Sequence, residues 1–176
     1  MKKTIKHLSI ILCIFMLIST FVVPVSAKTK KSGDFEYEEI GSTITVTKYT
    51  GKSSNLKIPA KIKGKKVTAI GYKTFESNKN LKSVSIPTTL KTIESSAFRG
   101  CSSLKSITIP QTVEEVGPFA FYNCKSLSKI TLKSKGTAIA KAAFKKTAYY
   151  EKNQIGKTDI YISANILLRL IKTLKQ

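Results

Sequence analysis

Apolar residues recur at a fixed spacing of 23 through the middle of the chain. The recurrence forms four columns of related side chains: Phe75, Phe98, Phe121 and Phe144; Ile70, Ile93, Val116 and Ile139; Leu81, Leu104 and Leu127; and Cys101 and Cys124. A period of this length is the signature of a repeat protein, in which each unit is one supersecondary structure. The columns therefore predict a solenoid whose stacked coils, about 4.8 Å apart, bury one continuous core.

The unit at residues 81–103 shows how one coil is built. Its residues 83–86, Ser-Val-Ser-Ile, alternate polar with apolar, which predicts a short β-strand with its apolar face inward. Pro87 ends that strand because it has no N–H to donate to a ladder. A second extended piece follows. Residues 94–99 then leave room for only a turn or two of helix before the chain turns back.

Four such units are visible, at residues 56–80, 81–103, 104–126 and 127–149. The Ile-Pro step at Ile58 precedes its counterpart at Ile86 by 28 residues, so the first unit contains a five-residue insertion within 61–66, predicted to project as a turn. In the last unit Lys133 replaces the proline and further lysines crowd the sequence. This change indicates a polar closing coil, with sequence drift as the alternative.

The segments on either side of the repeats differ from them. Residues 35–49 alternate apolar with polar around a Gly-Ser turn signal, which predicts a β-hairpin. Terminal units of a stacked array must close an open apolar end, so we interpret the hairpin as the N-terminal cap. Residues 150–176 leave the register, and we interpret them as a C-terminal cap. This cap is either an amphipathic helix or a second hairpin.

Residues 1–27 have the pattern of a secretory signal peptide. Lysines precede an uncharged, mostly apolar run from residue 8 to 23, and Val25-Ser26-Ala27 is a small-residue cleavage site. The run is short for a membrane-spanning helix, which needs roughly 20 apolar residues, although a retained anchor is the alternative. We therefore expect a cleaved signal, a linker at 28–34, the solenoid with its hairpin cap at 35–149, and the capping segment at 150–176.

The chain is strongly basic. It has 31 Lys and Arg residues against 10 Asp and Glu, for a net charge of +21. Cleavage after residue 27 removes three lysines and no acids, which leaves 28 basic residues against 10 acidic, or +18. Only Arg99 and Arg169 are arginines. Lysine is a point charge without a planar fork, so this composition favours diffuse attraction over bidentate recognition.

The repeats resemble the BspA-type leucine-rich repeat of secreted and cell-surface bacterial proteins, with the pattern L-x-x-I-x-I-P-x-x-V-x-x-I-x-x-x-A-F-x-x-C. One unit matches it at Leu104, Ile107, Ile109, Pro110, Val113, Val116, Ala120, Phe121 and Cys124. The preceding unit matches it at Leu81, Val84, Ile86, Pro87, Leu90, Ile93, Ala97, Phe98 and Cys101. The resemblance covers roughly residues 35–150.

This resemblance implies a β-rich leucine-rich-repeat solenoid of about four 23-residue coils with short helical turns, an N-terminal β-hairpin cap and a C-terminal cap. Members of the family often end in a Leu-Tyr-Ile strand pair, to which Ile160-Tyr161-Ile162 is similar, so the hairpin is the favoured form of the C-terminal cap. The family implies extracellular binding and supplies no catalytic residues.

Cys101 and Cys124 occupy the same column of neighbouring units. We favour two small buried side chains that fill the turn, and a disulfide between the coils is the alternative. A structural zinc site needs four ligands, which two thiols without a histidine do not supply. The sequence therefore predicts neither a metal nor a cofactor.

The predicted mature chain offers little for catalysis. His7, the only histidine, lies in the signal peptide, which excludes a histidine-activated nucleophile. Glu114 and Glu115 are adjacent on an extended piece, so they point to opposite sides and do not form a carboxylate pair. The phosphate-binding pattern G-x-x-x-x-G-K-[ST] does not occur. We therefore expect no enzyme activity.

Two sets of residues are candidates for a binding surface. The first set is basic and lies in the insertion and along the first-strand column: Lys61, Lys63, Lys65, Lys66, Lys82, Lys105 and Lys129. Stacking is expected to merge some of these lysines into a strip that attracts anionic polymers, and simple solubility is the alternative. The second set consists of outward strand residues that make a flat, polar face: Ser83, Ser85, Ser106 and Thr108.

These features predict a secreted or cell-surface, non-enzymatic module that binds an extracellular protein or glycan through its repeats, with no membrane span after signal cleavage. One alternative is a wall-associated structural protein held by its lysine charge on anionic polymers. Another is an accessory fragment of an extracellular enzyme system. Nucleic acid fits poorly because it needs aromatic platforms among basic groups, and Tyr72, Tyr122 and Tyr149 are scattered along the sequence.

Overall fold

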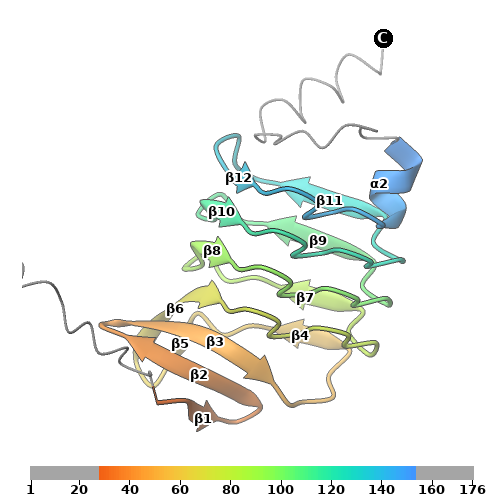
Figure 1. Ribbon diagram of the computed structural model, residues 1–176. Helices are drawn as coiled ribbons and strands as arrows, with labels where there is room; N and C mark the ends of the chain where they lie inside the picture. The colour runs from red at the N-terminus through yellow and green to blue at the C-terminus, as the bar shows by residue number, and fades with distance from the viewer. Residues whose placement is uncertain (1–27, 154–176) are drawn as a thin grey trace, which may run out of the picture.

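The computed structural model describes residues 28–153, which form a β-solenoid with two sheets (Figure 1). Sheet A contains β1 (Lys30–Ser32), β2 (Phe35–Ile40), β3 (Thr43–Tyr49), β5 (Lys61–Ile62), β6 (Lys65–Ile70), β8 (Thr92–Ile93), β10 (Glu115–Val116) and β12 (Ala138–Ile139). Sheet B contains β4 (Asn55–Lys57), β7 (Ser83–Ser85), β9 (Ser106–Ile109) and β11 (Lys129–Leu132). A short helix, α2 (Ala148–Asn153), follows. The predicted signal peptide and residues 154–176 of the predicted C-terminal cap lie outside the described residues.

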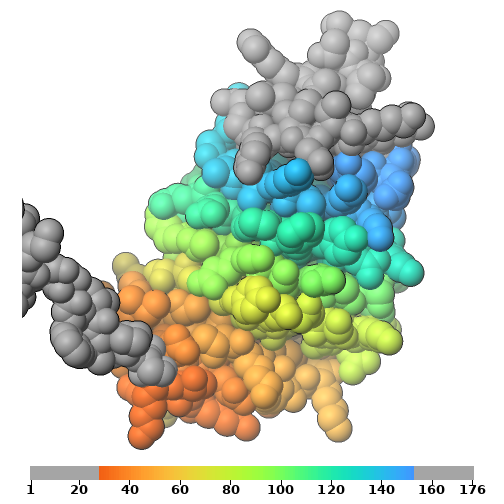
Figure 2. Space-filling model, viewed as in Figure 1, coloured from red at the N-terminus to blue at the C-terminus, as the bar shows by residue number. Residues whose placement is uncertain are grey.

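Each coil contributes one strand to sheet B and one to sheet A, and the first coil adds β5 to sheet A as well. The strands that stack from coil to coil are parallel. The pairs Thr92 with Glu115 and Ser106 with Lys129 show that successive coils are related by the 23-residue period. The predicted solenoid of about four coils is therefore confirmed. Figure 2 shows the coils as successive bands of colour along the molecule.

The insertion in the first coil is a β-hairpin. Asn55 of β4 pairs with Ser83 of β7, a separation of 28, whereas Ala69 of β6 pairs with Thr92 of β8, a separation of 23. The five extra residues are taken up between these strands, where β5 pairs antiparallel with β6. Lys63 and Gly64 at its tip have φ values of +50° and +79°, as a two-residue type I′ turn requires.

The phenylalanine column is the centre of the core. Its rings stack with centroids 4.8, 5.0 and 5.1 Å apart and planes within 7° of parallel. The hairpin formed by β2 and β3 extends the column by two rings, since Tyr49 lies 5.6 Å from Phe75 and Phe35 lies 5.3 Å from Tyr49. The hairpin therefore packs as a further layer of the stack, next to the first coil (Figure 1).

The other predicted core columns are also buried. Fully buried side chains occupy the isoleucine, leucine and cysteine columns from the first coil to the start of the fourth: Ile70, Ile93, Val116, Leu81, Leu104, Leu127, Cys101 and Cys124. Ile139 and Phe144 in the fourth coil are only partly buried. Within residues 28–153 no further coil stacks on them, so each lacks a neighbour on one side.

Two local predictions differ from the structure. Residues 94–99 form a run of tight turns in place of the predicted helical turn, which is not confirmed. Ser96 has a φ of +58° and Gly100 one of +72°, and a left-handed residue every four positions interrupts the φ of about −63° that a helix repeats. In addition, Lys30–Ser32 of the predicted linker forms β1, because a turn at Gly33 folds it back onto β2.

Candidate binding surface

The outward face of sheet B carries two rows of polar residues, most of them small. Strand alternation turns every second side chain away from the core, and the parallel register aligns these side chains from coil to coil. The first row contains Asn55, Ser83, Ser106 and Lys129, and the second contains Lys57, Ser85, Thr108 and Thr131. The hydroxyl of Ser83 donates a 2.7 Å hydrogen bond to Oδ1 of Asn55, its neighbour in the first row, which links two successive coils.

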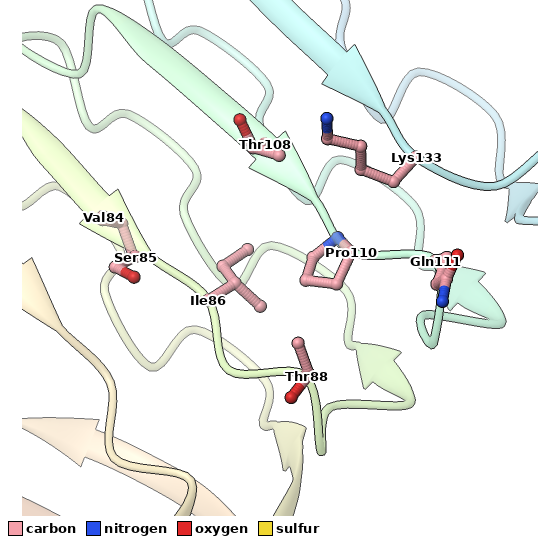
Figure 3. A pocket seen from close by; sticks show the side chains of 8 residues that line it. All are labelled: Val84, Ser85, Ile86, Thr88, Thr108, Pro110, Gln111 and Lys133. Atoms are coloured by element: carbon pink, nitrogen blue, oxygen red, sulfur yellow. The ribbon is translucent and has the colours of Figure 1, made fainter.

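A groove of about 550 Å³ lies where the strands of sheet B end. We call it the strand-end groove, and it is lined by Val84, Ser85, Ile86, Thr88, Thr108, Pro110, Gln111 and Lys133 (Figure 3). Ser85, Thr88 and Thr108 are exposed and supply the hydroxyls of the groove. Ile86 and Pro110 supply its apolar surface. The groove therefore combines an apolar floor with three hydroxyls, two of which, those of Ser85 and Thr108, stand on strands.

Lys133 supplies the cation of this groove. It occupies the column of Pro87 and Pro110, so the substitution that marks the last unit places an exposed ammonium above the Ile-Pro steps of the preceding coils. Its backbone N–H also donates to the carbonyl of Ile109 at 3.0 Å, a bond that proline does not make. In Figure 3 its side chain extends from the end of β11 toward Thr108.

The lysines of the insertion divide into two kinds. Lys65 donates to Glu39 at 2.6 Å and to the carbonyl of Gly41 at 3.3 Å, and Lys30 also pairs with Glu39 at 2.9 Å. The hydrogen bonds from Lys65 and then Lys30 hold the pKa of Glu39 below its usual value. Lys65 is therefore a structural tie between the insertion and the N-terminal hairpin.

Lys61 and Lys66 are direct cross-strand neighbours on the β5–β6 hairpin, and Lys63 lies at its tip. All three are exposed, and none makes an ion pair within residues 28–153. Like charges opposite one another across a β-ribbon are destabilising. The hairpin is therefore an uncompensated basic tip.

The remaining predicted lysines lie elsewhere. Lys82 and Lys105 occupy equivalent positions just before β7 and β9, and the N–H of Lys105 donates to the carbonyl of Lys82 at 3.1 Å. Lys129 belongs to the outward row of sheet B, beside Ser106. The structure thus places the basic tip in sheet A and the serine and threonine rows in sheet B.

Sequence reasoning did not identify Thr88, Gln111 or Lys133 as members of one site. Thr88 and Gln111 follow the Ile-Pro steps of different coils, and their shared place becomes visible only once the coils are stacked. The signal that pointed to Lys133 was its replacement of a proline in the repeat column.

The two cysteines have a structural role. Both are buried free thiols, and each donates to a phenylalanine carbonyl of the preceding coil, Cys101 to Phe75 at 3.1 Å and Cys124 to Phe98 at 3.0 Å. The neighbouring Cys124 thiol, followed by burial, raises the pKa of Cys101. The thiols therefore fill the turn column as small buried side chains. Residues 28–153 contain no cluster of three or more metal-ligating side chains.

Comparisons with known proteins agree with this fold. The model of the BspA type leucine rich repeat region, in six copies, matches residues 68–172, more than half of the chain. A search of curated proteins returned no match. None of the helices within residues 28–153 has the length and hydropathy needed to cross a membrane.

Several solved bacterial structures are similar to the chain. A leucine rich cell surface protein from Faecalibacterium prausnitzii is 27% identical with a TM-score of 0.52, and the match covers 71% of this chain and 48% of that one. A leucine rich repeat protein of T. pallidum is 22% identical with a TM-score of 0.49, covering 67% of each chain. A leucine-rich repeat protein from Bacteroides capillosus is 27% identical with a TM-score of 0.46, covering 60% of this chain and 98% of that one. The chain thus spans about half the length of the F. prausnitzii protein.

Proposed function

Because the chain belongs to the BspA-type leucine-rich repeat family, we propose that it is a non-enzymatic binding module of the cell surface or the extracellular medium. Its ligand site is the strand-end groove together with the adjoining outward rows of sheet B. The observation that carries this proposal is the groove itself, about 550 Å³ in volume, which lies within the range of about 300–1,000 Å³ typical of ligand pockets. The similarity to a cell surface protein of F. prausnitzii supports the extracellular location.

The chemistry of the groove defines the kind of ligand that it suits. Ile86 and Pro110 offer apolar contact, Ser85 and Thr108 offer hydroxyls that both donate and accept, and Lys133 offers one positive charge. The ligand is therefore a segment of protein or glycan that places an apolar group on the floor and an anionic group near Lys133. Ser85 and Thr108 stand on paired strands, and Ile86, Pro110 and Lys133 each directly follow the end of such a strand. Binding therefore needs little rearrangement, and preorganisation favours affinity.

The test is a binding measurement with variants that fill the groove. The purified chain is applied to a glycan array and to a panel of extracellular proteins, and affinities are then measured for the strongest ligands. Ser85→Lys and Thr108→Lys place a long side chain in the groove from outward positions, without touching the core. We expect either change to weaken binding by about tenfold or more, which corresponds to about 1.4 kcal/mol.

Ser126→Lys is the matched control, since it adds the same charge at an exposed position outside the groove. We expect its affinity to stay within about twofold of the original, as a surface change away from the contact usually allows. Equal binding by all three variants would remove the groove from the proposal.

The basic tip of the insertion supports a second function, attachment to an anionic wall polymer. Lys61, Lys63 and Lys66 are exposed and lack ion-pair partners within the described residues, so an external polyanion would relieve their repulsion. The chain would then be retained on the wall by charge. In this case about 1 M salt, where the Debye length falls to about 3 Å, releases the protein from washed cells.

Fractionation of the producing cells tests this attachment. We expect Lys61→Glu/Lys66→Glu to shift the protein from the wall fraction into the medium. The matched control Lys79→Glu/Lys125→Glu changes the net charge by the same amount at exposed turn positions. We expect it to leave the distribution unchanged. An identical distribution for both variants would show that the basic tip does not hold the protein on the wall.

A further inference from the structure

A group of aromatic and cationic side chains lies in the turns that connect sheet A to sheet B. It consists of Arg99, Phe119, Tyr122, Lys145 and Lys146, and we call it the aromatic–basic edge. The rings of Phe119 and Tyr122 meet edge to face, with centroids 5.6 Å apart and planes at 81°. Arg99 and Lys146 lie 5.7 and 5.4 Å from the centre of the Tyr122 ring. Stacking thus brings together residues from three successive coils.

Phe119 occupies a position where the fold does not require a phenylalanine. Phe119 is 44% exposed, and its backbone has a φ of +57°, which bulky residues rarely adopt. The equivalent residues of the other coils, Lys73, Ser96 and Ala142, have the same left-handed conformation. The left-handed backbone is therefore common to the repeat and does not single out this position. The exposed aromatic ring, at a place where the other coils carry Lys, Ser or Ala, is what points to recognition.

The edge also carries more positive charge than its internal ion pairs use. Glu76 lies 3.6 Å from Arg99, but it also pairs with Lys73 at 3.3 Å. Lys145 and Lys146 make no ion pair within residues 28–153. Lys146 instead hydrogen-bonds to the Tyr122 hydroxyl, and this bond lowers the pKa of Tyr122. The unpaired cations remain available to a negatively charged partner.

We propose that the aromatic–basic edge binds an acidic segment of a partner protein that places an apolar or aromatic side chain against Phe119. Phe, Tyr and Arg are enriched at protein interfaces and Lys is depleted, and buried Tyr and Arg anchors commonly dominate the binding energy. The surrounding cations select carboxylates and accelerate encounter. A purely polyanionic ligand would engage the lysines and leave Phe119 without a contact. This surface is separate from the strand-end groove, so the two proposals stand independently.

The test compares probes that separate charge from aromatic contact. The full chain is titrated with a random copolymer of glutamate and tyrosine, with polyglutamate of the same length, and with dextran sulfate. We expect the copolymer to bind about tenfold more tightly than polyglutamate. Phe119→Gly should abolish this preference, because it removes the ring and leaves the charges in place.

Two further variants complete the test. Lys145→Gln/Lys146→Gln should weaken both polypeptide probes severalfold. The control Lys31→Gln/Lys52→Gln removes two exposed lysines that belong to neither the basic tip nor the aromatic–basic edge, and it should bind as the original chain does. Glycine suits a φ of +57°, so Phe119→Gly should unfold at the same or a higher temperature.

Three results would overturn the proposal. The first is a copolymer preference that survives Phe119→Gly. The second is dextran sulfate binding more tightly than the copolymer and competing equally in both chains, which would indicate a glycan or a simple charge effect. The third is a clear fall in the unfolding temperature of Phe119→Gly, which would assign Phe119 to the stability of the fold.

Discussion

At the scale of single residues, Gly117 marks a close approach of two coils. Among the glycines of the repeats, it is the one whose added Cβ would come nearest to a neighbouring coil. A Cβ on Gly117 would lie 2.7 Å from the backbone nitrogen of Ser95 and 2.9 Å from the carbonyl carbon of Glu94. Backbone atoms cannot rotate away as a flexible side chain does, so Gly117→Ala forces the second and third coils apart. We expect a loss of about 1–3 kcal/mol in the free energy of unfolding, measured by chemical denaturation.

Gly136→Ala is the control for this prediction. Its added Cβ would meet only the Ser134 hydroxyl, at 3.8 Å, which is ordinary van der Waals contact. A loss at Gly117 no larger than the loss at Gly136 would contradict the close approach of the coils.

The sequence predicts the role of some single residues and not of others. The aromatic and leucine columns were predictable because a buried side chain recurs with the same chemistry in each coil. The left-handed positions were not, because Lys73, Ser96, Phe119 and Ala142 share a φ of +57° to +59° without sharing a residue type. None of the four is the glycine that usually marks this conformation. The predicted helical turn is not confirmed for this reason.

At the scale of elements, Glu39 ties three strands together. It lies on β2 and pairs with Lys30 of β1 at 2.9 Å and with Lys65 of β6 at 2.6 Å. Hydrogen bonds from Lys65 and Lys30 lower its pKa from 4.5, so the tie stabilises the fold above this pH and is lost as the pH falls through the lowered value. We expect Glu39→Gln to lower Tm at pH 7, and this difference to disappear progressively below pH 4.5.

Thermal unfolding over a range of pH measures this effect, and Glu38→Gln on the same strand is the control. Glu38 has no ion pair within the described residues, so its variant should follow the original chain at each pH. A Glu39→Gln difference that persists unchanged into acid would show that the tie depends on shape rather than charge. Added salt should also reduce the difference, because the partners are partly exposed.

Elements with a strong local signal were predictable, and those created by stacking were not. The hairpin at 35–49 and the extra five residues of the insertion follow from alternation and from a broken period. The strand at Lys30–Ser32 has no apolar pattern of its own and forms because Gly33 turns it onto β2. The strand-end groove draws its lining from three coils, so its composition depends on the register between them.

At the scale of the whole molecule, stability is distributed over interfaces between neighbouring coils, because each coil contacts mainly the next. Phe98 is completely buried between two rings of its column, at 4.8 and 5.0 Å. Phe144 is partly buried and has one ring neighbour within the described residues, at 5.1 Å. The same substitution should therefore have different effects at the two sites.

We expect Phe98→Ala to cost about 3–5 kcal/mol of unfolding free energy, the range found for large buried aromatic side chains, and Phe144→Ala to cost clearly less. Chemical denaturation of both variants, with circular dichroism as the readout, measures the two losses. Because both variants replace Phe with Ala, the chemistry of the substitution is the same, and the two sites differ in the number of neighbouring coils against which the ring packs. Equal losses would mean that the fourth coil is as fully enclosed as the second, and that stability is not set by stacking between neighbours. A larger loss at Phe98 would place the energetic centre of the protein in the inner coils. The basic tip, Lys133 and the aromatic–basic edge could then vary at the surface with little effect on the fold.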